Sequence, residues 1–527
     1  MSHSKGLRLD VIAPRSKFYQ GPYGRICPDL PAWRMEGTEA EIDAELLDFA
    51  TREMIELPGK TPGDIAGDQT IIDDLEARFS SNIPAAYTYF GQFIDHDVTF
   101  DPAPLTARQR DPSGILNFRT PRLDLDNVYG RGPDDQPYLY DKDDKAKLLI
   151  GRVRRGNYEL SGLRDLPRNE QGRALIGDMR NDENAMVSQL QLGFLLAHNT
   201  LVDRARVLGV AEPFEAARTT LRWLYQWVLW HDFVKRIAVD ETHDCALRLE
   251  KTCDGRKAWS LGLGDVYKWK NDPFMPVEFA VAAYRFGHSM VRNSYQTNNP
   301  HRGFGDFAPI FDNTGDADPD DLRGFRPMTE ANTVQWDWFL DMTTSVGPFF
   351  PQMARKIDTR LANALAALHE GPAGDPQNVL AFRNLKRGLT FGLPSGTAMA
   401  RKMCLKEVKL KPGEPDSLWY YILREAEALP GANSGQMLGR LGSTIVCATF
   451  AGLLKGDPCS YLNVDPCWTP DDDPLLCPGV DNIDSEGAWE LASIIRIAGL
   501  PVDSDDVEAQ SRGEYPDTVS CVGKASA

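Results

Sequence analysis

The chain is large and acidic, and its composition excludes several classes of protein. It has 527 residues, of which 42% are hydrophobic and 25% charged, so it can bury a sizeable core and is not disordered by default. The formal net charge of −18 and the lack of a basic stripe argue against nucleic-acid binding. The sequence contains no run of roughly 20 apolar residues, the length needed to span a membrane. The start of the chain lacks the apolar core of a secretory signal. We therefore expect a soluble protein, either cytoplasmic or exported by another route.

The chain divides into an arm, one large domain and a tail. Residues 1–35 are rich in Pro, Gly and Arg and predict an extended arm. At roughly 150 residues per domain, the length would suggest about three or four domains. No Ser/Gly linker or low-complexity run separates them, however. We therefore predict a single domain over residues 36–500 and a tail over residues 501–527.

The first half of this domain mixes helices with polar loops. Residues 38–57 predict a helix, in which Thr38 and a glutamate three residues later can form a capping box. Residues 85–97 predict a second helix. Residues 120–135 are turn-rich and crowded with carboxylates, and residues 145–168 could hold short strands.

The strongest helical patterns follow. Apolar residues recur at helical spacing in residues 181–209, 215–238, 277–291, 361–370 and 438–456. The sequence contains no alternating strand and helix pattern and no repeat period. We therefore predict a single large, mainly α-helical domain with little β structure.

The nine cysteines do not form a metal-binding pattern. No two of them are spaced as CxxC, which argues against a zinc ribbon. Cys459, Cys467, Cys477 and Cys521 gather in the acidic, proline-rich end of the chain, where we expect one or two disulfides. Because nine is an odd number, the cysteines cannot all pair within the chain. Their pattern is therefore compatible with a reducing or an oxidising compartment.

The motif GQFIDHD at residues 91–97 places unusual polar groups on an apolar helix. At about 100° per residue, Gln92 and His96 lie about 40° apart, and Asp95 lies about 60° to the other side of Gln92. These three side chains share one face. Asp97 lies roughly 140° from Gln92 and must serve another purpose.

Two other segments carry polar groups in apolar surroundings. In GDMRNDE, Arg180 and Glu183 are three residues apart and are expected to be adjacent on a helical surface. In YRFGH, His288 follows Gly287, with Arg285 one turn earlier. Taken singly, a helical histidine is more often a hydrogen-bonded core residue, and an Arg–Glu pair more often a weak surface ion pair. Together they describe a pocket with a base, a metal ligand and a fixed positive charge.

With these residues the chain resembles the animal-type haem peroxidase superfamily, which includes myeloperoxidase, peroxidasin and the cyclooxygenases. The resemblance runs from about residue 85 to about residue 455 and rests on five motifs in the family's order. They are GQFIDHD, DxDNVYG at 124–130, GDMRNDE, YRFGH and RNLKRGLTFGLPSG at 383–396. The resemblance implies haem b as cofactor, hydrogen peroxide as substrate and a ferryl intermediate that oxidises a small donor. The donor class stays open among halides, thiocyanate, phenols and aromatic amines.

The resemblance gives the polar residues their roles. His96 corresponds to the distal histidine, which takes a proton from hydrogen peroxide and returns it to the departing oxygen. Arg180 corresponds to the distal arginine, whose charge stabilises the breaking O–O bond. Gln92 corresponds to the distal glutamine, which orients a water or a halide. His288 corresponds to the ligand of the haem iron, and Asn384 to the partner of its second ring nitrogen.

Further cofactor contacts are implied in the same way. Asp95 and Glu183 match the two carboxylates that form ester links to haem methyl groups in many members, and Arg285 is expected to contact the cofactor. Asn184 stands where myeloperoxidase has a methionine that forms a third, sulfonium link. We therefore expect that link to be absent, and with it some of the ability to oxidise chloride. Whether either ester forms is not readable from the sequence.

Asp97 matches a calcium ligand of the family. In the loop 120–126 the implied ligands alternate, so that oxygens point to one side, as a hard cation needs. They are Thr120, the backbone carbonyl of Arg122, Asp124 and Asp126. A merely acidic turn is the plain alternative. Since Asp97 directly follows His96, a calcium ion bound to Asp97 would be coupled to the placement of His96 through one peptide bond.

Three other functions remain as alternatives. A haem fatty-acid dioxygenase of the same superfamily uses a tyrosine three residues before the iron-binding histidine, whereas this chain has Arg285 there and Tyr284 four before. An inactive calcium-binding adhesion or matrix protein would not need the residues expected around the haem iron, which are Gln92, His96, Arg180 and His288. A non-haem metal hydrolase would use His96 and Asp97, but no HExxH motif supports it.

Overall fold

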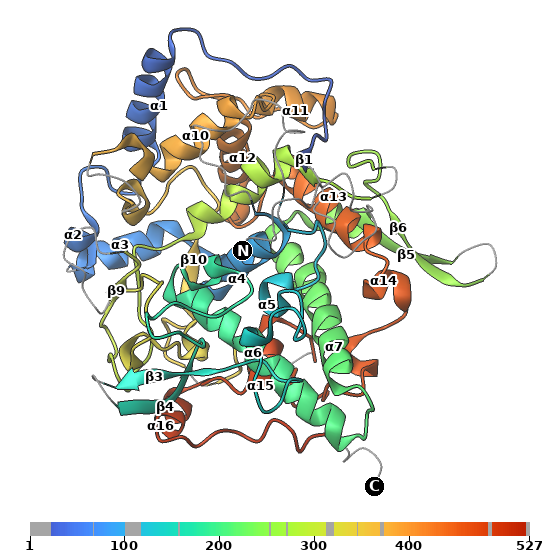
Figure 1. The fold of residues 1–527 in the computed structure, drawn as a ribbon. Helices are drawn as coiled ribbons and strands as arrows, with labels where there is room; N and C mark the ends of the chain where they lie inside the picture. The colour runs from blue at the N-terminus through green and yellow to red at the C-terminus, as the bar shows by residue number, and fades with distance from the viewer. Residues whose placement is uncertain are drawn as a thin grey trace, which may run out of the picture.

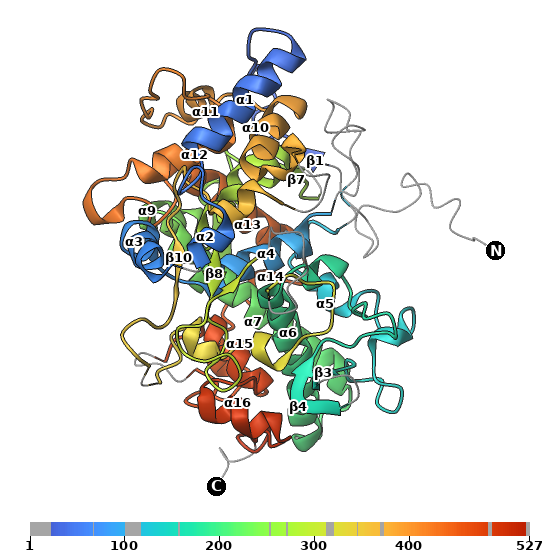
Figure 2. The same cartoon turned by 90° about the vertical axis from the view of Figure 1, so that its left-hand side faces the viewer.

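Helix α4 (Ala86–Val98) runs through the middle of the molecule, and the other elements surround it (Figure 1, Figure 2). Ten of its 13 residues are buried, and it occupies the range predicted from the sequence. The structure is a computed structural model. It describes residues 23–66, 68–100, 117, 119–155, 159–251, 255–269, 272–311, 321–344, 346–368, 374–482 and 487–522. Residues 1–22 of the predicted arm lie outside the described residues.

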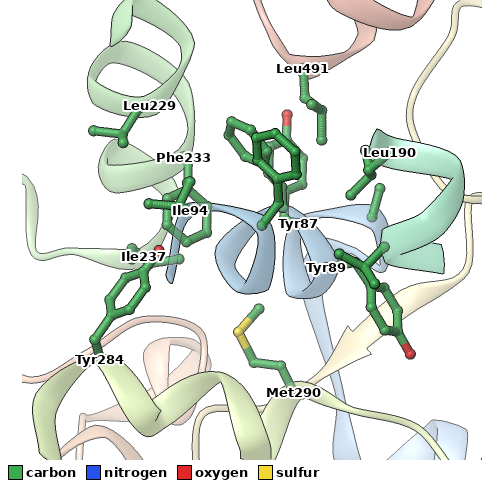
Figure 3. Close-up of a cluster of buried hydrophobic side chains, with 14 of the residues drawn as sticks. Tyr87, Tyr89, Ile94, Leu190, Leu229, Phe233, Ile237, Tyr284, Met290 and Leu491 are labelled. Carbon is green, nitrogen blue, oxygen red and sulfur yellow. The ribbon is translucent and has the colours of Figure 1, made fainter. Parts of the chain in front are cut away.

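Apolar side chains hold α4 on several sides. Tyr284 and Met290 approach α4 from one side and Leu491 from the other (Figure 3). Phe93 of α4 stacks on Phe194, with ring centroids 4.4 Å apart. Burial of such side chains stabilises the fold by roughly 25 cal/mol per Å² of apolar area.

Helices α6 (Ala185–Val207) and α7 (Pro213–Val228) pack against each other, and α6 also packs against α4. Asn184 caps the start of α6 through its side chain. Gly209 follows the end of α6 and has a φ of +71°. This left-handed backbone conformation after a helix favours glycine. Pro213 begins α7, where its missing N–H leaves no helical partner unpaired.

The remaining α-helices are shorter or more peripheral. They are α1 (Glu39–Glu53), α2 (Pro62–Ala66), α3 (Gln69–Phe79), α5 (Asp126–Tyr129), α8 (Lys235–Ile237), α9 (Asp240–Ala246), α10 (Leu380–Thr390), α11 (Gly396–Lys402), α12 (Leu418–Glu427), α13 (Arg440–Gly456), α14 (Tyr461–Val464), α15 (Leu491–Ala498) and α16 (Ser504–Ser511). The capping box predicted for α1 is present, formed by Thr38 and Glu41. None of the described helices has both the length and the apolar character needed to cross a membrane.

Strands are short and pair two by two. They are β1 (Tyr23–Gly24), β2 (Ser80–Pro84), β3 (Gly151–Arg155), β4 (Glu159–Asp165), β5 (Leu247–Lys251), β6 (Lys257–Leu261), β7 (Met275–Pro276), β8 (Ser294–Tyr295), β9 (Ala308–Pro309) and β10 (Met353–Arg355). The pairs are β1 with β7, β2 with β10, β3 with β4, β5 with β6 and β8 with β9. Helix accounts for 46% and strand for 10% of the structure. The fold is therefore mainly α, as predicted.

Two predicted helices contain turns that are not α-helical. The helix that begins with α7 continues as a π-helix, η6 (Leu229–Val234), before α8. The segment predicted as a helix over residues 277–291 is a π-helix, η7 (Glu278–Ala282), followed by a 3₁₀-helix, η8 (Ala283–Met290). Such turns often occur at functional sites, and η8 carries YRFGH.

The helix predicted over residues 361–370 is wrong for its described part. Only Asn363–Ala366 form a short 3₁₀ turn. The backbone here is engaged elsewhere, because Leu361 pairs with Ile55 in an isolated bridge. The Asn363 amide also donates to the carbonyls of Leu57 and Lys60, at 2.7 and 2.8 Å. These tertiary hydrogen bonds override a favourable apolar spacing.

The C-terminal segment is tied to the core covalently and by charge. Cys477 and Cys521 form a disulfide, which confirms that this region holds one. Cys459 and Cys467 are free. Arg204 of α6, which is fully buried, forms a bidentate ion pair with Asp481 at 2.6 and 2.9 Å. This pair joins α6 to the disulfide-bonded segment.

Replacing Asp481 with alanine is expected to lower the unfolding temperature markedly. The change strands a buried guanidinium, which costs about 3–5 kcal/mol. The control is Asp48→Ala, which breaks the exposed Arg52–Asp48 pair and should cost less than about 1 kcal/mol. Differential scanning calorimetry of both variants checks this, and equal unfolding temperatures would contradict it.

Candidate active site

One cavity of about 570 Å³ lies between α4 and the η7–η8 segment. Gln92, Asp95 and His96 of α4 line one part of it, and Arg285 and His288 of η8 line another. The cavity therefore brings together side chains that lie far apart in the chain. The three residues of α4 that share a face in the sequence analysis all reach it.

His96 is buried in the cavity wall, and its hydrogen bonds define its tautomer. Its Nδ1 lies 2.7 Å from Oδ1 of Asn181, whose amide nitrogen donates to Oε1 of Gln191 at 2.7 Å. Because this amide nitrogen is used on Gln191, Oδ1 faces the ring and accepts the Nδ1–H. Nε2 of the neutral ring then keeps its lone pair. Burial, together with the charge of Arg180, lowers the pKa of His96 to about 4, so the ring is neutral near neutral pH.

Arg180 is held by a carboxylate and by the backbone that follows His96. It lies in the 3₁₀ turn η5 (Met179–Asp182), and its Nη2 is 2.7 Å from Asp178. Nη2 also donates to the carbonyls of His96 and Thr99, at 2.9 and 2.7 Å. Although burial raises the pKa of Asp178, the charge of Arg180 holds it below its ordinary value. The guanidinium is thus a fixed charge at the cavity wall.

Gln92 is held between Glu183 and Asn184. Its amide nitrogen donates to the Glu183 carboxylate, and its oxygen accepts from Nδ2 of Asn184 at 3.1 Å. Oε1 of Glu183 also lies 3.8 Å from Nε2 of His96. Asn184 therefore caps α6 with its oxygen and orients Gln92 with its nitrogen. A methionine in its place would lose both hydrogen bonds, because a thioether has no N–H group to donate and its sulfur is only a weak acceptor.

His288 lies in η8 and faces the cavity. Side chains three residues apart eclipse in a 3₁₀-helix, and Arg285 lines the same cavity. The amide nitrogen of Asn384 in α10 donates to Nδ1 of His288 at 2.8 Å, while Arg387 donates to Oδ1 of Asn384 at 3.0 Å. Burial, followed by the charges of Arg285, Arg387 and Arg383, lowers the pKa of His288 well below its ordinary value. The ring is therefore neutral, the form that binds a metal.

The segment that carries His288 is anchored to two other elements. Arg292, in the loop after η8, donates to Glu76 of α3 at 2.9 Å and to the carbonyl of Met353 in β10 at 2.7 Å. Arg292 is 3% exposed. The pair therefore ties the loop that follows η8 to α3 and β10.

A second polar cluster lies beside α4 and does not line the cavity. Asp97, Asp124 and Asp126 each place a carboxylate oxygen within 4.8 Å of the others. Burial raises the pKa of all three carboxyls, that of Asp126 to about 8. For Asp97, the charges of Asp124 and Asp126 add to this effect. The Thr120 hydroxyl donates to Asp124 at 3.0 Å, and Arg122 lies between them in the loop.

The structure adds residues that the motifs did not single out. Asn181 and Asp178 both lie within GDMRNDE, but only the fold shows that Asn181 contacts His96 and that Asp178 pairs with Arg180. Gly324 and Phe325 also line the cavity, and they carry no sequence signal. A Cβ atom on Gly324 would lie 1.7 Å from the carbonyl oxygen of Asp182, so only glycine allows this approach. Three further cavity-lining arginines are Arg323, Arg383 and Arg387.

Comparison with known proteins gives a consistent result. Residues 103–409 match a family model described as animal haem peroxidase. This range includes Arg180, His288 and Asn384 and begins after His96. Heme peroxidase 2 of Caenorhabditis elegans is 23% identical in an alignment over 270 residues, which covers 41% of this chain. The alignment spans only 36% of that relative's length.

Solved structures share the fold at low sequence identity. Peroxidase A from Dictyostelium discoideum is 15% identical, with a TM-score of 0.53, over 86% of this chain and 92% of that chain. The fatty acid alpha-dioxygenase of Oryza sativa is 14% identical, also with a TM-score of 0.53, over 97% of this chain and 85% of that chain. A corresponding enzyme of Arabidopsis thaliana is 14% identical with a TM-score of 0.53, over 95% of this chain and 79% of that chain. These similarities establish the architecture and leave the reaction to be argued from the residues.

Proposed function

This chain belongs to the animal haem peroxidase family, and on that premise we propose that it is a haem-dependent peroxidase that reduces hydrogen peroxide and oxidises a small donor. The observation that carries the proposal is a single cavity lined by two histidines, His96 and His288. Asn181 keeps Nε2 of His96 unprotonated, and Asn384 meets Nδ1 of His288. His96 is therefore arranged as a base, and His288, neutral and lining the same cavity, is the candidate metal ligand.

The residues present fit a haem group. Cationic side chains outnumber carboxylates in the cavity lining, which suits the two propionates of haem. They are Arg180, Arg285, Arg323, Arg383 and Arg387, against Asp95 and Glu183. The volume of about 570 Å³ falls within the roughly 300–1,000 Å³ typical of cofactor and ligand sites. His288 would hold the iron, and haem would supply the redox centre at which peroxide is reduced.

His96 would move the proton during peroxide reduction. Its Nε2 accepts a proton from one peroxide oxygen and delivers it to the other as the O–O bond breaks. The Asn181 hydrogen bond keeps the ring in the required tautomer. Arg180 adds a fixed positive charge for the departing oxygen. Gln92 would orient a water or a halide in the same space.

Two carboxylates and one departure from the family bear on the choice of donor. Asp95 and Glu183 both line the cavity, and we propose that each forms an ester link to a methyl group of haem, with hydrogen peroxide as the two-electron oxidant. Asn184 has no thioether, so no sulfonium link can form there. We therefore expect bromide, iodide, thiocyanate or phenolic and aromatic donors to be oxidised more readily than chloride.

A fatty-acid dioxygenase would use a cavity tyrosine to abstract hydrogen. Tyr284 lines the cavity, but its hydroxyl donates to the Gly91 carbonyl at 3.1 Å and its ring stacks on Phe279 at 4.7 Å. Arg285 occupies the position three residues before His288. The tyrosine is thus packed into the core, which favours the peroxidase.

The proposal is tested by an absorbance spectrum of the hemin-loaded protein before and after one equivalent of hydrogen peroxide, followed by a donor screen. A haem absorption band that changes with peroxide and returns when a donor is added supports it. Oxygen uptake with a fatty acid and no peroxide would support the dioxygenase instead. A hemin-loaded protein that reacts with neither would point to an inactive calcium-binding adhesion or matrix protein.

We also propose that Asp97, Asp124 and Asp126 hold a calcium ion. Oδ1 of Asp97 and Oδ1 of Asp124 are buried without a hydrogen-bond partner among the described residues. Buried carboxylate oxygens that lack a donor suit a hard cation, which Thr120 and the Arg122 carbonyl could also bind. Arg119 pairs with Asp126 at 2.9 Å and neutralises part of the charge. A divalent ion would balance the rest.

Removing calcium is expected to lower the unfolding temperature. A ligand at 100 times its dissociation constant stabilises the folded state by about 2.7 kcal/mol. Thermal unfolding with calcium and with a chelator measures the effect, and Asp124→Asn should abolish the difference. Asp143→Asn, which changes an exposed carboxylate, is the matched control. If the native chain unfolds at the same temperature in both conditions, the calcium proposal is wrong.

A further inference from the structure

A second pocket lies at the opposite end of α6 from the candidate active site. It has a volume of about 390 Å³ and is bounded by the β3–β4 hairpin, α6 and the C-terminal segment 515–519. No residue lines both this pocket and the candidate active site. In both views the β3–β4 hairpin and α16 lie side by side (Figure 1, Figure 2).

Two arginines face each other across the hairpin at this pocket. Arg152 of β3 and Arg164 of β4 are direct partners in the antiparallel ladder, and both line the pocket. Directly opposed residues point to the same face of a sheet, and like charges in that position are destabilising. Such a break of a local rule, without compensation in the fold, often marks a functional site.

Neither guanidinium has a carboxylate partner among the described residues. By contrast, Arg155 of the same hairpin pairs with Glu330 at 2.8 Å. The one acid that lines the pocket, Asp203, is already matched by Lys147 at 2.7 Å. The pocket therefore carries an uncompensated positive charge on a chain whose formal net charge is −18.

The pocket is held in shape by several contacts. The Arg164 guanidinium lies over the Tyr515 ring, 3.9 Å from its centroid, and the Tyr515 hydroxyl donates to the Gly162 carbonyl at 2.5 Å. A Cβ atom on Gly162 would lie 2.1 Å from the carbonyl oxygen of Gln510, so glycine is required for this close approach. The Cys477–Cys521 disulfide ties down the same segment. The binding surface is therefore preformed.

Donors converge on the pocket from more than one element. Thr200 of α6 and Thr518 of the C-terminal segment line it, with their hydroxyls 3.2 Å apart. Burial, with the charge of Arg152 beside it, lowers the pKa of Arg164 from its ordinary value. Two planar guanidinium forks and two hydroxyls offer more hydrogen-bond donors than a single carboxylate can accept, and guanidinium forks match phosphate oxygens.

We propose that this pocket binds a small phosphate-bearing anion between Arg152 and Arg164, either inorganic phosphate or a small phosphate ester. The anion would offset the repulsion between the two arginines. It would also join the β3–β4 hairpin, α6 and the C-terminal segment. The inference does not depend on the peroxidase activity, because the two pockets share no residue.

Isothermal titration of the full chain with inorganic phosphate, and separately with glycerol phosphate, tests this at constant ionic strength. Saturable binding of one anion per chain is expected for at least one of the two, and the tighter one identifies the source. Arg152→Gln and Arg164→Gln should each weaken binding by about tenfold or more, because each removes a charge-assisted hydrogen bond. Arg154→Gln, an exposed arginine on the same strand that does not line the pocket, should bind as the native chain does.

Thermal unfolding gives a second, independent readout. Without phosphate, Arg152→Gln should unfold at a higher temperature than the native chain, because the like-charge pair is removed. With saturating phosphate the native chain should gain stability, and the variant should gain less. Absence of saturable binding, or equal weakening by Arg154→Gln, would overturn the proposal. So would a phosphate-dependent stabilisation that is the same in all variants, since that is a general salt effect.

Discussion

Replacing His288 by alanine is expected to abolish stable haem binding. The ring is neutral and lines the cavity, and Asn384 occupies Nδ1, so Nε2 is the ring nitrogen left for the iron. Loss of the iron ligand removes the coordinate bond and leaves only apolar and ionic contacts with the porphyrin. The measurement is a hemin titration followed by the haem absorption band, in which the variant should show weak binding or none.

His301→Ala is the matched control, because His301 lies outside the cavity and the variant should bind hemin as the native chain does. Added imidazole should restore the absorption band of His288→Ala, since a free ligand can occupy the space that the side chain leaves. A purely structural role for His288 would not allow this rescue. Undiminished hemin affinity in His288→Ala would remove the assignment of the iron ligand.

Replacing His96 by alanine is expected to slow the reaction with peroxide while leaving hemin bound. General acid–base help contributes about 10²- to 10⁴-fold to such a step, and the variant lacks the group that moves the proton. Stopped-flow absorbance after mixing the hemin-loaded protein with peroxide measures the rate constant. An unchanged rate constant, with normal hemin affinity, would show that another group carries the proton.

One further variant and one comparison separate the chemistry of His96 from its positioning. Asn181→Ala should slow the same step less than His96→Ala, because the ring remains but its tautomer is no longer held by the Asn181 oxygen. His198 provides the comparison with a buried histidine that has no catalytic role. Burial lowers its pKa to about 4, as for His96, but it binds Tyr129 and a backbone carbonyl and lines no part of the cavity. A lowered pKa alone therefore does not identify the base.

Local sequence patterns predicted the helices that carry the distal side of the site. The apolar spacing in residues 85–97 is long and regular, and α4 forms there with Gln92, Asp95 and His96 along one cavity. The same holds for α6 and α13, whose interiors are apolar over many turns. In such segments the intrinsic preference and the tertiary packing agree, so the pattern is reliable.

Short apolar segments were less predictable. Residues 361–370 have the spacing of a helix, but the backbone of Leu361 bonds to Met54 and Glu56. The side-chain amide of Asn363 also donates to the carbonyls of Leu57 and Lys60. Residues 277–291 are helical but adopt π and 3₁₀ turns. A few residues gain little from their own helix, so distant partners decide their conformation.

The sequence by itself determined the mainly helical class, the polar face of α4 and the motifs that carry His96, Arg180 and His288. Those features depend on neighbours within a few turns, which periodicity reports directly. Only the tertiary structure decided that His96 and His288 line one cavity and that Asn181 sets the tautomer of His96. It also decided that Arg152 and Arg164 lie opposite each other and line the second pocket. These are contacts between distant segments, and their geometry follows from how the whole core packs.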